Sequence, residues 1–464
     1  MGHGRAPGVV VVGAGIIGLA AAWRALDAGA TVTVLDPAPG AGATHAAAGM
    51  LGPTMEADFG ERDLARFGAR SVRLWPEFAA VLERAAGLPP GALGLDASGT
   101  LAVAFDADDA ALLRRRLALH RDLGLGSREI PVAEARDREP SLGPRIAAAA
   151  WIPGDHQVDP RAVHRALLRV VTAHPDATLV TRAVASLRRT AVPGVIPDPG
   201  AASTPRGGAS GPGVLLSEGS APDREALPRE RIPFLAMDGT ASRPEALSRE
   251  RVAGVVDEDG DGVEHPVGPA RASEAPPRER VAGVVDEDGV EHPADVVVLA
   301  AGYASAGLYG GAATRAVPGT TLRLEADAAA GPSVVVRGTV QGRSVYVVPR
   351  AARGDGRREI VVGASSDERD ATTRTRAGDV FALLRDARAL LPGLDEADLI
   401  ETTTRSRPAT PDNLPLIGMA EPGLFLATGH HRNGILLTPH TAAVVGRHLA
   451  RLFENPAPHE GAFA

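Results

Sequence analysis

The sequence predicts an α/β fold that opens with a strand, a glycine turn, a helix and a second strand, and continues into an α+β part with a mixed, largely antiparallel sheet. The first observation is a β-branched run, Val9–Val12, which is too short for a helix and leads into the turn Gly13–Gly18. The second is the helical stretch Leu19–Ala28, which Gly29 ends. Thr31–Leu35 follows as a buried strand, so the unit has the roughly 30 residues of a β-α-β motif with parallel strands.

Further helices and strands follow from hydrophobic spacing. Leu74, Phe78 and Leu82 recur on one face of a predicted helix. Asp159 stands before Pro160, as an N-cap residue stands before proline in the first turn of a helix. Short strands between residues 320 and 363 are typical of antiparallel pairing. The expected helices are 64–86, 107–123, 160–173, 377–391 and 435–453, and the expected strands are 99–105, 295–299, 320–325, 333–337, 344–349, 359–363 and 424–428.

Composition excludes several classes of protein. The chain has 464 residues, which at roughly 150 residues per domain indicates two or three domains. Its 49 basic and 57 acidic residues give a net charge of −8 and are spread along the chain, so no nucleic-acid partner is expected. Because there is no cysteine, disulfides, thiolate metal sites, catalytic thiols and a flavin tethered through cysteine are excluded. All the basic residues are arginine, which excludes Schiff-base lysine enzymes and the Walker A phosphate loop.

The apolar segments are too short to cross a membrane. No run of 18 uninterrupted apolar residues occurs, so no membrane span is predicted. Met1–Ala22 has an early arginine and a long apolar run, like a secretory signal, but three glycines break the run and it continues as the predicted helix. We therefore expect a cytoplasmic protein, and a periplasmic one stays open.

A segment from about residue 190 to 273 is rich in Gly, Pro, Ser, Arg and Glu, which predicts a disordered insertion over 191–278. Glu245–Gly260 returns with two changes at Glu274–Gly289, where it leads into the predicted strand at 295–299. We interpret this last copy as a native hairpin and the earlier copies as duplications outside the fold. Acids at 257, 259 and 261 have the spacing of a calcium loop, but the twelfth position is Gly268 in place of Glu. An acidic turn is favoured, and no metal site is expected.

The glycine turn predicts a dinucleotide-binding site. The pattern G-x-G-x-x-G between a strand and a helix allows a pyrophosphate to approach the backbone at the helix N-terminus. Asp36 lies at the end of the second strand, where its carboxylate can accept hydrogen bonds from a ribose 2′-hydroxyl. This favours NAD or FAD over NADP. The small residues of Gly42–Leu51 need a partner surface to hold their shape, and a bound cofactor would supply one.

Four segments together resemble one family. Thr44–Leu51, with the opening turn, looks like the FAD-dependent D-amino-acid oxidase family, and in particular its glycine oxidase branch, which is associated with thiamine biosynthesis. Ser344–Arg350 resembles the strand that carries the active-site tyrosine, although Ser344 stands where some relatives have histidine. Arg407-Pro408 with Asp412–Gly418 resembles the carboxylate-binding segment, and Gly429–Pro439 is similar to the C-terminal signature of the branch.

The resemblance implies FAD as cofactor, and a Rossmann-like domain of the glutathione-reductase type beside a substrate domain. We expect the FAD-binding domain over 1–90, 147–190, 279–312 and 405–458, and the substrate domain over 91–146 and 313–404. The resemblance does not extend to the insertion. The expected cofactor-binding residues are Gly13, Gly15, Ile17, Gly18, Asp36, Thr44, Ala47, Gly49, Met50, Val184, Gly302, Gly429, Arg432, Asn433, Gly434, Ile435 and Leu436.

The resemblance also implies catalytic roles. Arg407 is expected to bind the substrate carboxylate as a bidentate guanidinium, and Tyr346 to donate a second hydrogen bond to it. Arg432 either faces the substrate or anchors its turn, and Met50 lines the substrate side of the flavin. Backbone amides of 434–436 would stabilise negative charge on the reduced ring. The histidines at 45, 430 and 431 are expected to be structural and not metal ligands.

The expected activity is oxidation of glycine, and of small N-methyl or D-amino acids, with oxygen giving hydrogen peroxide and the imine hydrolysing to glyoxylate and ammonia. Two alternatives stay open. One is a D-amino-acid or sarcosine oxidase, or a dehydrogenase that passes electrons to a quinone. The other is a non-catalytic FAD-binding protein. The expected partners are a small amino acid and molecular oxygen. A homo-oligomer and a flavin held covalently through histidine also stay open.

Overall fold

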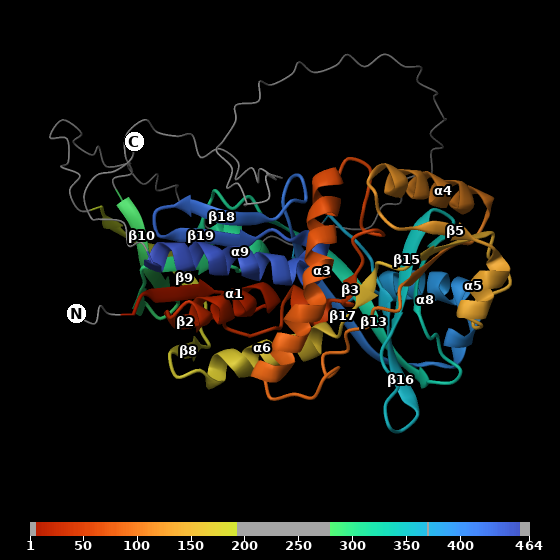
Figure 1. The fold of residues 1–464 in the computed structure, drawn as a ribbon, viewed down its shortest axis with the longest axis horizontal. Coiled ribbons are helices and arrows are strands. Elements are labelled where there is room, and N and C mark those ends of the chain that lie inside the picture. Colours follow the sequence, from red (N-terminus) through yellow and green to blue (C-terminus); the bar gives the residue numbers. More distant parts are fainter. Residues whose placement is uncertain (1–5, 193–278, 369–370, 455–464) are drawn as a thin grey trace, which may run out of the picture. The chain divides into compact units, whose positions relative to one another are not determined.

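The computed structural model describes residues 6–192, 279–368 and 371–454, which form two large β-sheets with helices around them (Figure 1). Nearly all of the predicted insertion, with the earlier repeat copies and the calcium-like pattern, lies outside the described residues. Within the described part, no helix is both long enough and apolar enough to pass through a lipid bilayer.

The first sheet has six strands in the order β18-β19-β12-β1-β2-β8. Val10 of β1 pairs in parallel with Val297 on one side and Thr33 on the other, and only β18 runs antiparallel to its neighbour. All five residues of β1 are buried because both faces of the sheet are covered, which explains the uninterrupted valine run. The strands are β1 (Gly8–Val12), β2 (Thr31–Leu35), β8 (Ala177–Val180), β12 (Val296–Leu299), β18 (Leu416–Glu421) and β19 (Leu424–Thr428).

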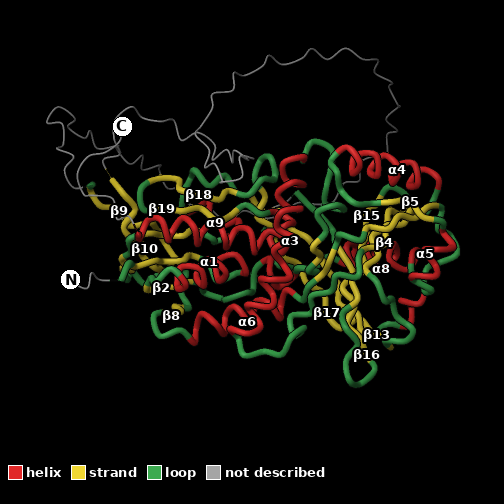
Figure 2. The backbone as a smooth tube through the Cα atoms, in the orientation of Figure 1, coloured by secondary structure: helices red, strands yellow, loops and turns green. Residues whose placement is uncertain are grey.

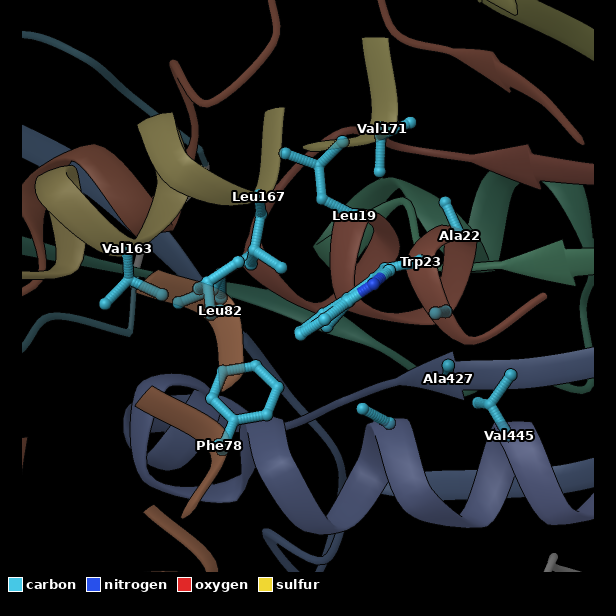
Figure 3. Close-up of a cluster of buried hydrophobic side chains, with 14 of the residues drawn as sticks. Leu19, Ala22, Trp23, Phe78, Leu82, Val163, Leu167, Val171, Ala427 and Val445 are labelled. Atoms are coloured by element: carbon cyan, nitrogen blue, oxygen red, sulfur yellow. The ribbon is translucent and has the colours of Figure 1, made fainter. Parts of the chain in front are cut away.

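Helices cover one face of this sheet and a small sheet covers the other. The helices are α1 (Ile16–Asp27), α3 (Arg62–Ala85), α6 (Pro160–Ala173) and α9 (Gly434–Glu454). Trp23 of α1 lies among side chains of α3 and α6 (Figure 3), with its ring 5.8 Å from that of Phe78 in an edge-to-face arrangement. As predicted, Asp159 caps α6 by accepting from the amides of Arg161 and Ala162.

The small sheet has three strands, β9 (Val184–Ala191), β10 (Glu279–Asp286) and β11 (Glu291–Pro293). Val281 and Val284 of β10 pack with Val297 of the six-stranded sheet. β10 and β11 form the antiparallel hairpin that the last repeat copy predicted. β9 and β10 are also antiparallel, and Ala191 pairs with Glu279, so the two described chain ends beside residues 193–278 are neighbours.

The second sheet has eight strands in the order β17-β13-β16-β15-β14-β4-β6-β5 (Figure 2 shows its strands in yellow). All neighbouring pairs are antiparallel except β14 and β4, which confirms the mixed, largely antiparallel prediction. The strands are β4 (Thr100–Ala104), β5 (Arg128–Ile130), β6 (Ala148–Ile152), β13 (Arg315–Asp327), β14 (Val335–Val340), β15 (Arg343–Pro349), β16 (Arg357–Gly363) and β17 (Asp398–Ala409).

One face of the eight-stranded sheet packs against α8 (Ala377–Leu390), with Val336, Val347 and Val362 in that core. The opposite face is covered at one end by α4 (Ala107–Asp122), which packs on Ala102 and Ala150. The remaining short elements are α2 (Ala43–Ala46), β3 (Met50–Leu51), α5 (Val132–Arg138), β7 (His156–Gln157), η1 (Gly302–Ala304), α7 (Ser305–Leu308), η2 (Pro392–Glu396) and η3 (His431–Asn433).

The division into FAD-binding and substrate domains stays a prediction. Each of the six predicted segments supplies at least one strand to the sheet expected of it, but β6 and the end of β17, which fall in predicted FAD-binding segments, belong to the eight-stranded sheet. β6 lies just beyond the predicted boundary at 147, and β17 crosses the boundary at 405.

Candidate cofactor and active site

A cavity of about 800 Å³ lies between the glycine turn after β1 and the free face of the eight-stranded sheet. Its walls include the glycine turn, the end of β2, the small-residue segment 40–50, the start of α9 and residues of β13, β14, β15 and β17. Segments that are far apart in the sequence therefore line the same cavity.

The glycine turn is shaped by close backbone contacts. Gly13 has a φ of 104°, and a Cβ there would stand 2.5 Å from the carbonyl oxygen of Ala300. A Cβ at Gly18 would stand 1.8 Å from the carbonyl oxygen of Gly13, so α1 can approach the turn only without a side chain. Gly15 faces the cavity, where a Cβ would meet only Thr44 Oγ1, at 3.5 Å. The N-terminus of α1 is thus open to an anion from the cavity.

Asp36 is fixed at the end of β2. Its Oδ2 accepts from the amide of Ala14 at 2.7 Å and its Oδ1 from the amide of Ala38 at 2.8 Å. The side chain lines the cavity, and each oxygen keeps a lone pair for another donor. This is the arrangement that a ribose hydroxyl requires.

The small-residue segment is held by protein side chains. Thr321 Oγ1 donates to the carbonyl of Ala46 at 3.1 Å, and Arg350 Nη2 donates to the carbonyl of Ala48 at 2.6 Å. Arg350 also donates to the carbonyl of Val158 at 3.0 Å. The eight-stranded sheet thus supports the segment, and because residues of the segment also line the cavity, the expected contact with a cofactor stays a prediction.

Two polar groups at the start of α9 lack a partner. His431 Nδ1 and Asn433 Nδ2 are buried, line the cavity and have no hydrogen-bond partner among the described residues. Burial, helped by the charges of Arg432 and Arg407, lowers the pKa of His431 to about 4. Burial also lowers the pKa of His430, whose Nε2 lies 3.0 Å from Thr441 Oγ1, to about 3, so both are neutral at pH 7. An oxygen-rich ligand in the cavity would satisfy the free amide of Asn433.

These features fit FAD. The glycine turn accommodates a pyrophosphate at a helix N-terminus, Asp36 suits a ribose, and the unpartnered amide of Asn433 faces the same cavity. The cavity volume lies within the ordinary range for ligand sites of about 300–1,000 Å³.

A row of side chains crosses the eight-stranded sheet on the cavity side. We call it the Tyr346 row; it consists of one residue from each of six adjacent strands, in register. Arg337 of β14 pairs with Tyr346 of β15, and Tyr346 pairs in turn with Gly363. Its members are Ala102, Arg337, Tyr346, Gly363, Thr321 and Thr403.

Gly363 leaves room for the tyrosine, since a Cβ there would stand 2.3 Å from Tyr346 Oη. Burial raises the pKa of Tyr346, so the phenol stays protonated and can donate a hydrogen bond. Arg407 reaches the same end of the cavity from β17. Burial lowers the pKa of Arg407, but a guanidinium remains charged at any physiological pH.

Glu56 joins two further arginines at this end of the cavity. Its carboxylate forms ion pairs with Arg337 Nη1 and with Arg432 Nε, the latter at 2.6 Å, and Arg432 Nη2 also binds Glu61 Oε2 at 2.8 Å. Burial alone would raise the pKa of Glu56, but the guanidinium groups of Arg337 and Arg432 outweigh it and the pKa is lowered. Arg432 therefore anchors its turn to residues 56–61.

Most of the predicted site residues line the cavity: Gly13, Gly15, Ile17, Asp36, Thr44, Ala47, Gly49, Met50, Val184, Gly302, Tyr346, Arg407, Arg432, Asn433, Gly434 and Ile435. Three predicted cofactor residues do not. Gly18 packs α1 against the turn, and Gly429 faces Thr410, where a Cβ would stand 2.5 Å from its Cγ2. Leu436 lies in the core, and its carbonyl accepts from Ser71 Oγ and Trp75 Nε1.

The sequence analysis missed Glu56 and Arg337. Arg337 is the one charged residue in the apolar strand Val335–Val340, a signal that would have singled it out. Glu56 gives no such signal, because it follows an irregular stretch. His45 contacts Arg161 Nη2 and Glu401 Oε1, a structural role as expected, and the described residues hold no cluster suited to a metal ion.

The family model for FAD dependent oxidoreductases, abbreviated DAO, matches residues 8–263 and 238–448 of the chain. The chain belongs to this DAO family. Its cofactor is therefore FAD, as the glycine turn, Asp36 and the resemblance predicted, and it is an FAD-dependent oxidoreductase. The family membership also confirms the predicted fold class.

Named relatives of this DAO-family chain include a bifunctional protein ThiO/ThiG from Nostoc sp., with 28% identity over 445 residues, covering 94% of this chain and 52% of that protein. The chain thus spans about half the length of that relative. A glycine oxidase from Geobacillus kaustophilus is 26% identical over 442 residues, covering 94% of this chain and 91% of that one. The crystal structure of glycine oxidase from the same organism has a TM-score of 0.67 at 24% identity, with 96% and 95% of the two chains covered, and so shares the fold.

Proposed function

We propose that this DAO-family enzyme oxidises glycine, and also sarcosine or small D-amino acids, at the carbon that carries the amine. Glycine, oxygen and water would give glyoxylate, ammonia and hydrogen peroxide. A relative from Geobacillus kaustophilus that matches 94% of the chain is named glycine oxidase, which supports the proposal. FAD, when bound, supplies the acceptor for the hydride.

The observation that carries the proposal is the state of Arg407. It donates one hydrogen bond, to the carbonyl of Ser365 at 3.2 Å, and has no carboxylate within ion-pair distance among the described residues. A guanidinium that faces a cavity without an acidic partner is matched to a carboxylate ligand, which it can hold through two parallel hydrogen bonds. An α-amino acid brings that carboxylate.

Tyr346 supports the same binding mode. Its phenol lies on the cavity face, is protonated, and interacts electrostatically with Arg407. A carboxylate held by Arg407 would accept a second hydrogen bond from the tyrosine. Two contacts from two strands would fix the direction of the bond between Cα and its hydrogen.

The start of α9 would complete the site. This helix has 21 residues, and its first two, Gly434 and Ile435, line the cavity. Its N-terminal amides favour negative charge nearby. No residue is required as a base if the amine binds unprotonated, which agrees with neutral His430 and His431.

Anaerobic addition of glycine to the holoenzyme tests the proposal. We expect the visible absorbance of the flavin to bleach, and the same protein in air to form one hydrogen peroxide per glyoxylate. Sarcosine and D-alanine, and an artificial electron acceptor in place of oxygen, separate the related oxidases and a dehydrogenase. Colour that persists with every amino acid would contradict the proposal and favour a non-catalytic FAD-binding protein.

We also propose a pathway and a compartment for the enzyme. The reaction would supply thiamine thiazole synthesis in the cytoplasm, with a small amino acid and oxygen as partners. A thiamine requirement after deletion of the encoding gene would support this setting. Light scattering on the purified holoenzyme decides whether it is a homo-oligomer.

A further inference from the structure

Arg116 is a cation at the cavity that lacks a fixed partner. It lies on α4 one turn after Leu113, and both side chains line the cavity. Arg116 forms no hydrogen bond and no ion pair within the part of the chain that the structure describes, whereas Arg114 binds Glu129 at 3.0 Å and Arg115 lies over the ring of Phe59. Its guanidinium is therefore available to a ligand.

The carboxylates at this end of the cavity pair with other arginines and leave the charge of Arg116 without a counter-ion. Glu56 is shared by Arg337 and Arg432, and Glu61 adds a second carboxylate to Arg432. Asp58 is the acid with the largest electrostatic effect on Arg116, but the two form no ion pair. Burial lowers the pKa of Arg116, which still leaves the guanidinium charged. A half-buried charge without a partner loses part of its hydration, and an anion would offset that loss.

Small side chains line the cavity near Arg116. α4 packs over Ala102 of the Tyr346 row, and Ala102 is the neighbour of Arg337 in that row. Thr339 and Ser344 pair with each other on the same two strands as Arg337 and Tyr346, and both line the cavity. The wall between Arg116 and Tyr346 thus includes an alanine and two hydroxyls.

We infer that the substrates of this site include amino acids with a second carboxylate, which Arg116 binds while Arg407 holds the first. The inference rests on the proposed function for the role of Arg407 and for the reaction. The second carboxylate would be carried either on a methylene group of the amine nitrogen, as in iminodiacetate, or on the side-chain methylene group, as in D-aspartate. Iminodiacetate, oxygen and water would give glyoxylate, glycine and hydrogen peroxide, by loss of one hydride and one proton to the acceptor and hydrolysis of the imine.

Binding of unreactive analogues to the holoenzyme tests this inference without turnover. Diglycolate and methoxyacetate differ only by the second carboxylate and place an ether oxygen where the substrate has nitrogen. D-Malate and D-lactate form the corresponding pair for a carboxylate on the side-chain methylene group. In calorimetric titrations we expect the dicarboxylate of at least one pair to bind about tenfold tighter or more, the effect of a charge-assisted hydrogen bond. The pair that shows the preference identifies where the carboxylate is attached.

Variants assign the preference to a residue. Arg116→Gln should reduce the ratio of the two affinities to near one, and Arg116→Glu should reverse it. Arg114→Gln, on the same helix and outside the cavity, should keep the ratio. Equal binding within both pairs, a preference that survives Arg116→Gln, or one that Arg114→Gln also removes would each overturn the inference.

The proposed function is tested separately by glycine turnover. Glycine oxidation without a dicarboxylate preference would overturn only the inference. A preference that depends on Arg116, in a protein that does not oxidise glycine, would support the second binding site and contradict the proposed function.

Discussion

The guanidinium of Arg407 lies against Gly319 of the neighbouring strand, and a Cβ at position 319 would stand only 2.1 Å from Arg407 Nη1. Gly319 pairs with Arg405 of β17. Arg407 lies two residues further along the same strand, so the side chains of Arg405 and Arg407 project from the same face of the sheet. The position of the proposed carboxylate-binding group thus depends on the absence of a side chain on β13.

Gly319→Ala should displace the guanidinium of Arg407 while the protein still folds, because the atom in the way is the end of a flexible side chain. We expect the KM for glycine to rise about tenfold, the size of one weakened charge-assisted hydrogen bond. Steady-state kinetics measure this. Gly378→Ala in α8, where a Cβ would meet nothing within 4 Å, is the control. An unchanged KM in Gly319→Ala would contradict the role of Arg407.

Arg407→Ala should have a larger effect, because it removes the guanidinium altogether. We expect the KM for glycine to rise by about a hundredfold or more, since a bidentate contact to the carboxylate is lost. Arg388→Ala, which removes a cation paired with Asp395 on the surface, should leave the kinetics as they are. Equal kinetics of the two variants would show that another group binds the carboxylate.

Glu56 and Arg337 should be coupled in stability. Glu56→Gln leaves Arg337 and Arg432 with less counter-charge, and breaking a buried pair costs about 3–5 kcal/mol. In Arg337→Met, Glu56 loses its ion pair with Arg337 but still has its ion pair with Arg432. A double-mutant cycle measured by denaturant unfolding should give a coupling of about 1–3 kcal/mol. Additive effects would mean that the ion pair does not stabilise the protein.

Acid should destabilise the protein through its buried histidines. Burial lowers the pKa of His430 to about 3 and that of His431 to about 4, whereas both have a pKa near 6.5 when unfolded. The unfolded chain therefore binds more protons, and the stabilisation present above pH 6.5 is lost as the pH falls toward 4. Each histidine should contribute about 1.4 kcal/mol per pH unit in that window.

His430→Gln removes one titrating group, so the slope of unfolding free energy against pH between 4 and 6 should fall by about 1.4 kcal/mol per unit. His174→Gln, at a half-exposed histidine, serves as the control. If His430→Gln and the parent protein had the same slope, His430 would not be neutral and buried in solution.

The chain between β9 and β10 should be replaceable. Ala191 and Glu279 are antiparallel partners, so a two-residue Asn-Gly turn suits the gap between the strands. A protein in which this turn replaces residues 192–278, so that it joins Ala191 directly to Glu279, should keep its flavin and its glycine activity. The absorbance ratio at the flavin and protein maxima measures cofactor content, and an apoprotein would show that the removed residues are needed for binding.

The sequence predicted the parts of the fold that depend on local rules. The valine run, the glycine turn and the cap at Asp159 each follow from neighbours within a few positions, and all three are confirmed. β17 was missed because Asp398–Ala409 is rich in threonine and charge, without apolar alternation. β6 was missed because its three alanines favour a helix in isolation, and pairing with β4 and β5 overrides that preference.

The site was predictable only in part, for a similar reason. Arg407 and Tyr346 were identified because each lies in a motif that resembles the family. Glu56 and Arg116 reach the cavity through the packing of residues 52–61 and of α4, which no local pattern encodes. Arg337 does have a local signal, as the one charged residue of an apolar strand, but only the strand register places it beside Tyr346. Leu436 was assigned to the cofactor from its place in a motif, but its position on α9 turns it into the core.

On β14 and β15, the residues of the Tyr346 row line the cavity and the residues next to them form the core. Arg337 and Tyr346 face the cavity, while their immediate neighbours Val336 and Val347 build the core against α8. Because side chains alternate along a strand, one substitution in the row alters the pocket wall and leaves the packed layer beneath it intact. Substrate preference in such a protein can drift by single exchanges with little penalty to folding, which makes this sheet a suitable starting point for laboratory evolution toward new amines.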